Sequence, residues 1–206
     1  MRISSALRTL AKQAAFWTAT LVVAPALISY RLRAVVFGSD RALEGSTQWL
    51  SLVPGVLGQY LRRAFLCRVL ASCDRSATVE FGTIFSRTGA RIDEHAYVGP
   101  GCRLGLVHIR RDALLAPGVH VPSGPATHGI DDLATPIRLQ PGNPRMIDIG
   151  AGSWIGSGAV VLANVGRDTV VAAGSVVTRS LPDRVVAAGV PCRVVRSRER
   201  GARQTA

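Results

Sequence analysis

Residues 149–182 carry a hydrophobic repeat of six residues, and this repeat constrains the fold more than any other feature of the chain. Small residues recur four places after most of the aliphatic ones. An amphipathic helix would repeat its apolar face every 3.6 residues and a half-buried strand every 2 residues. A period of six with small residues at the corners is instead typical of a parallel β-helix. The aliphatic positions are Ile149, Ile155, Val161, Val165, Val171 and Val177, and the small ones are Ser153, Ala159, Thr169 and Ser175.

The same register begins faintly near residue 79, becomes clear at residue 92 and stops at residue 121. Three rungs per turn then predict about four to five coils in total. Residues 122–147 interrupt the repeat with a long segment rich in proline and glycine. Long loops that leave a rigid scaffold often carry function, so we expect the catalytic loop here.

The charge of +12 divides the chain into three parts. Residues 1–72 carry +7, the repeat body at 73–192 carries +1, and a basic tail at 193–206 carries +4. Basic ends can meet an anionic lipid surface or a phosphorylated cofactor. The basic groups show no aromatic interleaving and no nucleic-acid motif, so we expect no nucleic-acid partner. The predicted fold class is all-β, a parallel β-helix with an N-terminal helical extension that could associate with a membrane.

The N-terminal extension contains an uncharged run at residues 13–30, which is 18 residues long. A helix that crosses a bilayer needs about 20 apolar residues, and Pro25 interrupts this run. A Pro54-Gly55 break precedes residues 56–70, where the pattern predicts an amphipathic surface helix with arginines on its polar side.

Three interpretations of residues 1–72 are open. They form a membrane-attached hairpin or pair of interfacial helices, a soluble helical appendage on the body, or a cleaved secretory signal. The positive charges that flank the apolar runs are nearly balanced, so they do not fix an orientation.

His128 is the candidate catalytic residue because it lies within the long loop, between small residues and ahead of Asp131 and Asp132. A histidine whose pKa is near neutrality is the usual general base for activating a hydroxyl. From the residues alone, an ordinary loop histidine is the alternative.

Metal binding is not expected. His95, His120 and His128 are separated by 25 and 8 residues, which does not stack them on coils of 18 residues. The four cysteines form no C-x-x-C pair or metal-finger spacing.

Three segments that occur in order resemble the C-terminal coils of the hexapeptide-repeat acyltransferases. They read SWIGSGAVVLANVG from residue 153, VVAAGSVVTRSLPD from residue 170 and VVAAGVPCRVVR from residue 185. The chain is most similar to the galactoside, maltose and nodulation O-acetyltransferase branch, over about residues 79–197 and not over 1–72. The resemblance implies a left-handed β-helix, a homotrimer, and acetyl-CoA or another acyl-CoA as co-substrate.

The resemblance also implies roles for individual residues. His128 would act as the base on the acceptor hydroxyl. Asp131 and Asp132, which follow it in the loop, are our own candidates for a carboxylate that orients it. Six positions would bind the cofactor: Trp154 beside its arm, Ser157 and Ala173 in contact with it, Thr178 near its far end, and Arg193 and Arg196 on its phosphates. Plain packing is the alternative for Trp154, and a solvated basic face is the alternative for the two arginines.

Two features depart from the galactoside and maltose enzymes. The rung that begins at Val161 is two residues shorter, and the acceptor-binding asparagine of an upstream coil is absent. These departures affect the identity of the acceptor more than that of the reaction.

The sequence therefore predicts an acyl-CoA-dependent O-acyltransferase at the cytoplasmic face of the inner membrane. We expect its acceptor to be a sugar of a surface polysaccharide or of a lipid-linked glycan. The alternatives are an N-acetyltransferase acting on an amino sugar, a non-catalytic scaffold in a membrane complex, and a metal-dependent hydratase.

Overall fold

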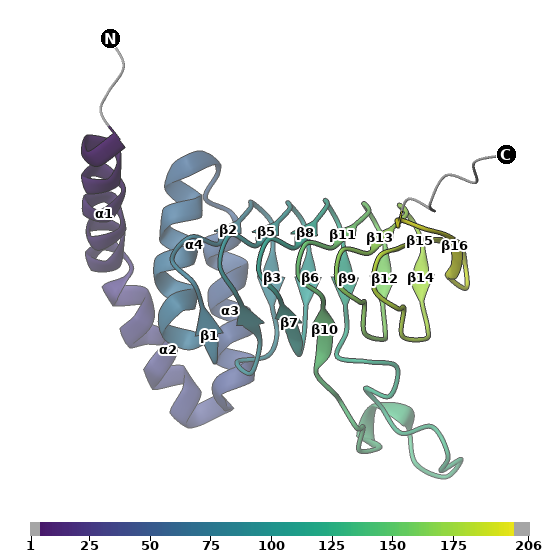
Figure 1. The fold of residues 1–206 in the computed structure, drawn as a ribbon. Coiled ribbons are helices and arrows are strands. Elements are labelled where there is room, and N and C mark those ends of the chain that lie inside the picture. Colours follow the sequence, from purple (N-terminus) through teal and green to yellow (C-terminus); the bar gives the residue numbers. More distant parts are fainter. Residues whose placement is uncertain (1–4, 200–206) are drawn as a thin grey trace, which may run out of the picture.

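The computed structural model describes residues 5–199, with side chains from residue 13 onward. Four helices precede a column of short strands, and the helices cover one end of that column (Figure 1). The helices are α1 (Ser5–Val22), α2 (Ala24–Phe37), α3 (Ser39–Ser51) and α4 (Gly55–Val69).

The strands form three sheets, which we name faces A, B and C in the order in which the chain visits them in each coil. Face A contains β1 (Ser72–Cys73), β4 (Arg91–Ile92), β7 (Val107–Ile109) and β10 (Ile147–Ile149). Face B contains β2 (Thr78–Val79), β5 (Tyr97–Val98), β8 (Leu114–Leu115), β11 (Trp154–Ile155), β13 (Val170–Val171), β15 (Val185–Ala188) and β16 (Arg193–Ser197). Face C contains β3 (Ile84–Phe85), β6 (Arg103–Leu104), β9 (His120–Val121), β12 (Val160–Val161) and β14 (Val176–Val177).

The predicted fold class is confirmed, because every strand from β1 to β15 pairs in parallel with the strand one coil away. The prediction of about four to five coils is too low, since the column makes about six turns. Single bridges that join Ile149, Val165 and Leu181 continue face A beyond β10. The first coil is hard to detect in the sequence because Cys73 and Phe85 hold inward positions there in place of small aliphatic residues.

Small polar residues do more than fit the corners of the coils. The buried Ser153 hydroxyl donates to the Gly166 carbonyl at 2.7 Å, and the buried Thr169 hydroxyl donates to the Pro182 carbonyl at 2.7 Å. Each bond crosses to the next coil, so the repeat combines apolar burial with satisfied polar groups. Gly156 is required at its corner, because a Cβ there would lie 2.4 Å from the Ala173 nitrogen.

The helical end of the column is closed by side chains of α3 and α4. Arg62 is only 2% exposed, and its guanidinium donates to the carbonyls of Val79, Val53 and Leu50 at 2.9, 2.7 and 3.1 Å. The prediction of an amphipathic surface helix at 56–70 is therefore wrong about Arg62. This arginine is buried because no preceding coil donates N–H groups to the carbonyls at the open edge of the first coil, and its guanidinium donates to Val79 there instead.

α1 packs on α4, and α2 packs on α3. Pro25 lies in the first turn of α2, where its missing N–H costs nothing, and the chain bends by 50° at this point. No single helix within residues 5–199 is long and apolar enough to cross a bilayer, although Gln13–Val22 and Ala24–Phe37 together pass that test as a bent pair. Apolar side chains that stay exposed on these helices include Leu21, Val22, Ile28, Leu32, Val35 and Val36.

At the other end of the column, residues 193–197, which the charge pattern assigns to the basic tail, form strand β16. β16 pairs antiparallel with β15, from Val185 opposite Ser197 to Ala188 opposite Arg193. The rest of the predicted tail beyond residue 199 lies outside the described residues.

Candidate functional site

The predicted catalytic loop leaves face C after β9, returns on face A as β10, and projects from the column (Figure 1). Its two arms are joined by the Arg145 N–H donating to the Ser123 carbonyl at 2.8 Å and the Asn143 N–H donating to the Ala126 carbonyl at 2.7 Å. These bonds give the long loop a defined base.

Gln140 organises the outer part of the loop, and the sequence does not predict this role. Its amide nitrogen donates to the carbonyls of Asp132 and Thr135 at 2.6 and 2.7 Å, and its side chain is buried. The sequence carries only a weak signal for this role of Gln140, because a single glutamine in a segment without periodicity does not indicate which groups it bonds.

His128 lies on the outgoing arm and is exposed. The returning arm approaches closely at Gly142, where a Cβ would lie 2.1 Å from the Thr127 carbonyl oxygen. Among the described residues, neither Asp131 nor Asp132 forms a hydrogen bond or ion pair with His128. Hydrogen bonds from the Thr135 hydroxyl and the Ala134 N–H lower the pKa of Asp132, so this carboxylate stabilises the loop.

Trp154 is half-exposed on face B, between Leu114 and Val170 of the neighbouring strands. Trp154 belongs to a row of outward-facing residues, one on each successive strand of face B. This row continues from Val170 through Val186 to Arg196 on β16. Strands lie about 4.8 Å apart, so Arg196 is roughly 14 Å from Trp154 along the column.

Ser157 and Ala173 occupy successive turns at the corner where face B meets face C. The Gly174 N–H donates to the Ser157 carbonyl at 2.8 Å, which stacks the two turns. Arg193 lies opposite Ala188 at the next level of the same corner. We name this surface the cofactor edge; its residues are Trp154, Ser157, Ala173, Arg193 and Arg196.

The two arginines of the cofactor edge form no ion pair with a carboxylate in the described part of the chain. Their guanidinium groups donate to main-chain carbonyls, from Arg193 to Cys192 at 3.0 Å and from Arg196 to Ser197 at 3.2 Å. Both residues are exposed and can hold an anionic group of a ligand.

Thr178 is separated from the other predicted cofactor residues. It follows β14 at the opposite end of face C, the corner at which the long loop also leaves the column. We name this second surface the loop edge; its residues are His128 and Thr178. One chain therefore holds the predicted site residues in two groups, with face C between them.

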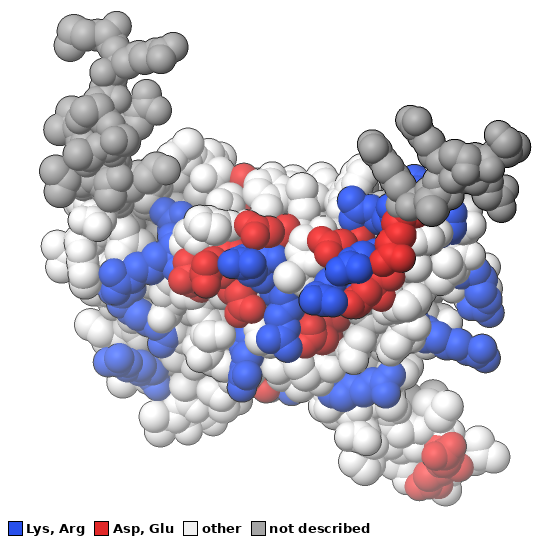
Figure 2. Space-filling model, viewed as in Figure 1, with Lys and Arg blue, Asp and Glu red and all other residues white. Residues whose placement is uncertain are grey.

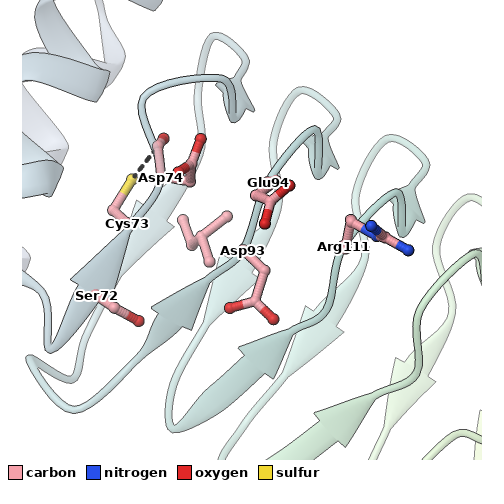
Figure 3. Close-up of a pocket in the computed structure, with 7 residues that line it drawn as sticks. Ser72, Cys73, Asp74, Asp93, Glu94 and Arg111 are labelled. Atoms are coloured by element: carbon pink, nitrogen blue, oxygen red, sulfur yellow. Dashed lines mark hydrogen bonds between the residues drawn. The ribbon is translucent and has the colours of Figure 1, made fainter.

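A further hollow of about 500 Å³ lies where face A meets face B, away from both edges (Figure 3). In this hollow, the His108 Nε2 lies 2.9 Å from the Asp93 Oδ1, at hydrogen-bond distance, and Asp74 accepts hydrogen bonds from the N–H and the hydroxyl of Ser76. Residues 5–199 contain no group of three or more His, Cys, Asp or Glu residues that could hold a metal ion. The labelled lining residues are Ser72, Cys73, Asp74, Asp93, Glu94 and Arg111.

No family model matches the chain. A putative acetyltransferase of Saccharomyces cerevisiae is 42% identical over 93 residues, which cover 44% of this chain and 45% of that protein. The galactoside O-acetyltransferase of Escherichia coli is 54% identical over 52 residues, or 24% of this chain and 26% of that protein. The chain thus spans less than half the length of these curated relatives.

Solved structures share the fold. A hexapeptide-repeat acetyltransferase from Vibrio cholerae superposes with a TM-score of 0.63 at 22% identity, covering 78% of this chain and 93% of the other. An N-acyltransferase from Bacillus cereus, solved with dTDP and 3-hydroxybutyryl-CoA, gives a TM-score of 0.51 at 19% identity, covering 60% and 70%. The resemblance of the repeat body to hexapeptide-repeat acetyltransferases is confirmed.

Proposed function

We propose that this protein is an acyl-CoA-dependent O-acyltransferase that moves an acetyl group to a sugar hydroxyl. The observation that carries the proposal is the cofactor edge. The exposed Trp154 begins a row of outward-facing residues on face B that ends at Arg196. Neither Arg193 nor Arg196 forms an ion pair with a carboxylate of residues 5–199. An aromatic face beside the pantetheine arm and guanidinium groups on the phosphates suit coenzyme A.

The proposal includes a homotrimer, because one chain keeps the loop edge and the cofactor edge apart. In the trimer, the loop edge of one chain would meet the cofactor edge of the next. His128 would then face a thioester held largely by the neighbouring chain, and Thr178 would complete the far end of that cofactor site.

The chemistry is direct transfer in a ternary complex. His128 accepts the proton of the acceptor hydroxyl while the hydroxyl oxygen attacks the thioester carbonyl, and a backbone N–H stabilises the oxyanion. The carbon–sulfur bond then breaks, and the departing thiolate takes the proton from the imidazolium. The products are the sugar ester and free coenzyme A, and no covalent enzyme intermediate forms.

We further propose that the acceptor is a sugar of a surface polysaccharide or lipid-linked glycan, modified at the cytoplasmic face of the inner membrane. The exposed apolar side chains of α1 and α2 support attachment to a membrane surface. The second candidate is N-acylation of an amino sugar, which the similarity to the N-acyltransferase favours.

The test is release of coenzyme A from acetyl-CoA with a panel of sugars, amino sugars and lipid-linked oligosaccharides. We expect His128→Ala to lower kcat by roughly 10²- to 10⁴-fold. Arg138→Ala, at an exposed position in the same loop, is the control and should keep full activity. Unchanged turnover in His128→Ala would contradict the mechanism, and a preference for amines would favour the N-acyltransferase.

The shared site is tested by co-expressing His128→Ala with Trp154→Ala. Mixed trimers contain some sites with both residues intact, so we expect activity to return above that of either variant alone. Light scattering gives the mass of the assembly. A monomer with full activity would contradict a site built from two chains.

A further inference from the structure

A cavity of about 610 Å³ lies between α1, α4 and the first coils of the column, far from the loop edge. Its volume is typical of sites for small ligands, which enclose roughly 300–1,000 Å³. The lining combines the aromatic side chains Phe16, Trp17 and Tyr60 with the cationic side chains Arg63 and Arg75. None of these residues belongs to either edge of the proposed acyl-transfer site.

The two arginines of this cavity are oriented by aromatic rings. The Arg75 guanidinium carbon lies 5.0 Å from the centre of the Phe16 ring and 5.3 Å from that of Trp17. The Arg63 guanidinium carbon lies 4.6 Å above the Tyr60 ring. Stacking fixes the plane of a guanidinium group and leaves donors at its edge for an anion.

Neither arginine has a carboxylate within ion-pair distance in the described part of the chain, in contrast to Arg110 and Arg167 on the coils. Arg110 pairs with Asp148 at 2.6 Å, and Arg167 pairs with Asp183 at 3.0 Å. Figure 2 shows the difference: red and blue groups mix along the coils, whereas the helical end carries blue groups beside uncharged surface.

Asp74 is the carboxylate in the lining of the cavity, and it already accepts hydrogen bonds from Ser76. The Ser76 N–H and hydroxyl donate to it at 2.7 and 2.6 Å, and these bonds lower its pKa. Two guanidinium groups against one satisfied carboxylate leave the cavity positive, so the complementary ligand group is an anion such as a phosphate.

The mouth of the cavity is apolar and faces outward. Trp17 is 53% exposed and Val56 is 65% exposed, and both also line the cavity. Trp17 belongs to α1, the helix that, with α2, carries the exposed apolar surface. Tryptophan and tyrosine favour the headgroup level of a membrane, where one end of the ring is apolar and the other is wet.

We propose that this cavity binds the phosphate headgroup of an anionic membrane lipid between Arg63 and Arg75, with the lipid chains leaving past Trp17 and Val56. The inference rests on the proposed membrane attachment. It adds a defined lipid site to that attachment, on the face of the molecule where the coils begin.

The test uses dihexanoylphosphatidylglycerol as a dispersed lipid, added to full-length protein in which Trp49→Phe and Trp154→Phe leave Trp17 as the remaining tryptophan. We expect a saturable change in Trp17 fluorescence. Arg63→Gln/Arg75→Gln should weaken the affinity by roughly tenfold or more, the value of a charge-assisted hydrogen bond. Arg91→Gln/Arg138→Gln removes the same charge at exposed positions elsewhere and should leave the affinity unchanged.

Three outcomes would overturn the proposal: equal affinity for dihexanoylphosphatidylcholine, equal affinity for inorganic phosphate, or equal weakening in the two double variants. If Arg63→Gln/Arg75→Gln unfolds, as judged by circular dichroism, Arg75→Gln alone replaces it, because Arg75 is exposed.

Sedimentation with phosphatidylglycerol vesicles tests the attachment separately. Binding of the short-chain lipid without vesicle association would contradict the proposed membrane attachment and support the lipid site in the cavity. Vesicle association that does not change in Arg63→Gln/Arg75→Gln would contradict the lipid site. The acetyl-transfer assay is independent of either outcome.

Discussion

The repeat body and the helical cap are stabilised by different chemistry. In the body, each coil after the first buries an equivalent set of aliphatic side chains, so one rule accounts for those levels. In the cap, single polar side chains that occur once each satisfy the open edge of the first coil: Arg62, Thr47 and Asp40. A repeat fold of this kind is thus specified by its period but ended by individual hydrogen bonds.

The largest loss of stability should come from a change in the body. Ile155 is fully buried in the fourth coil, and Ile155→Ala should lower the free energy of unfolding by about 4 kcal/mol through lost burial and a cavity. Ile155→Val, which removes one methylene, should cost about 1 kcal/mol. Denaturant unfolding measures both, and a loss below about 1 kcal/mol for Ile155→Ala would contradict a closely packed body.

The next loss should come from the cap. Arg62→Met keeps the packing of the side chain but leaves the carbonyls of Val79 and Val53 without this donor, and we expect a loss of about 3 kcal/mol. The Nη2 atom of Arg62 is buried without a hydrogen-bond partner, which limits the loss. If denaturant unfolding finds the Arg62→Met variant as stable as the wild type, the cap is held by apolar contact, as the body is.

Thr47→Val should have a smaller effect, about 2 kcal/mol in the free energy of unfolding, at nearly constant volume. The buried Thr47 hydroxyl accepts from the Phe85 N–H at 3.3 Å and shares its proton between the Phe85 carbonyl at 3.1 Å and the Glu44 carbonyl at 3.0 Å. Valine therefore leaves the N–H and the carbonyl of Phe85 without these bonds. Thr47→Ser keeps the hydroxyl and is the control. If both variants lose equal stability, the methyl group is what matters at this position.

The smallest effect should depend on pH. Partial burial raises the pKa of Asp40, but bonds from Thr88 and the Arg87 guanidinium outweigh it and hold that pKa below its ordinary value. A lowered pKa in the folded state stabilises the protein above the unfolded value of about 4, and this contribution is lost as the pH falls through the folded pKa.

Asp40→Asn should therefore cost less than about 1 kcal/mol at pH 7, because the pair with Arg87 is exposed to solvent. The difference from wild type should shrink toward roughly pH 3 in thermal melts. A difference that grows on acidification would mean that the folded state raises the pKa of Asp40 instead of lowering it.

The sequence predicts the body well, because the period of six is visible wherever aliphatic residues fill it. The pattern is only faint in the first coil, where Phe85 and Cys73 replace them. The cap is predicted only as helices, with Arg62 as a surface group, since sequence spacing shows which residues share a helix face and not which carbonyls lie opposite.

The candidate site is predicted residue by residue but not in its arrangement. Trp154, Ser157 and Ala173 lie together because their spacing follows the repeat. The separation of Thr178 from them depends on which corner each turn occupies, and the support of the loop by Gln140 depends on contacts without a period. The position of Thr178 one rung after Ala173 follows from spacing once each coil has three rungs, whereas the role of Gln140 does not follow from spacing.

Calorimetric titration of acetyl-CoA tests the cofactor edge without any knowledge of the acceptor. We predict saturable binding to the wild type, and at least roughly tenfold weaker binding to Arg193→Ala/Arg196→Ala. Arg91→Ala/Arg138→Ala, which removes the same charge away from the cofactor edge, should bind as the wild type does. No binding of acetyl-CoA or longer acyl-CoAs to the folded, assembled protein would contradict the proposed acyl transfer and favour a non-catalytic scaffold.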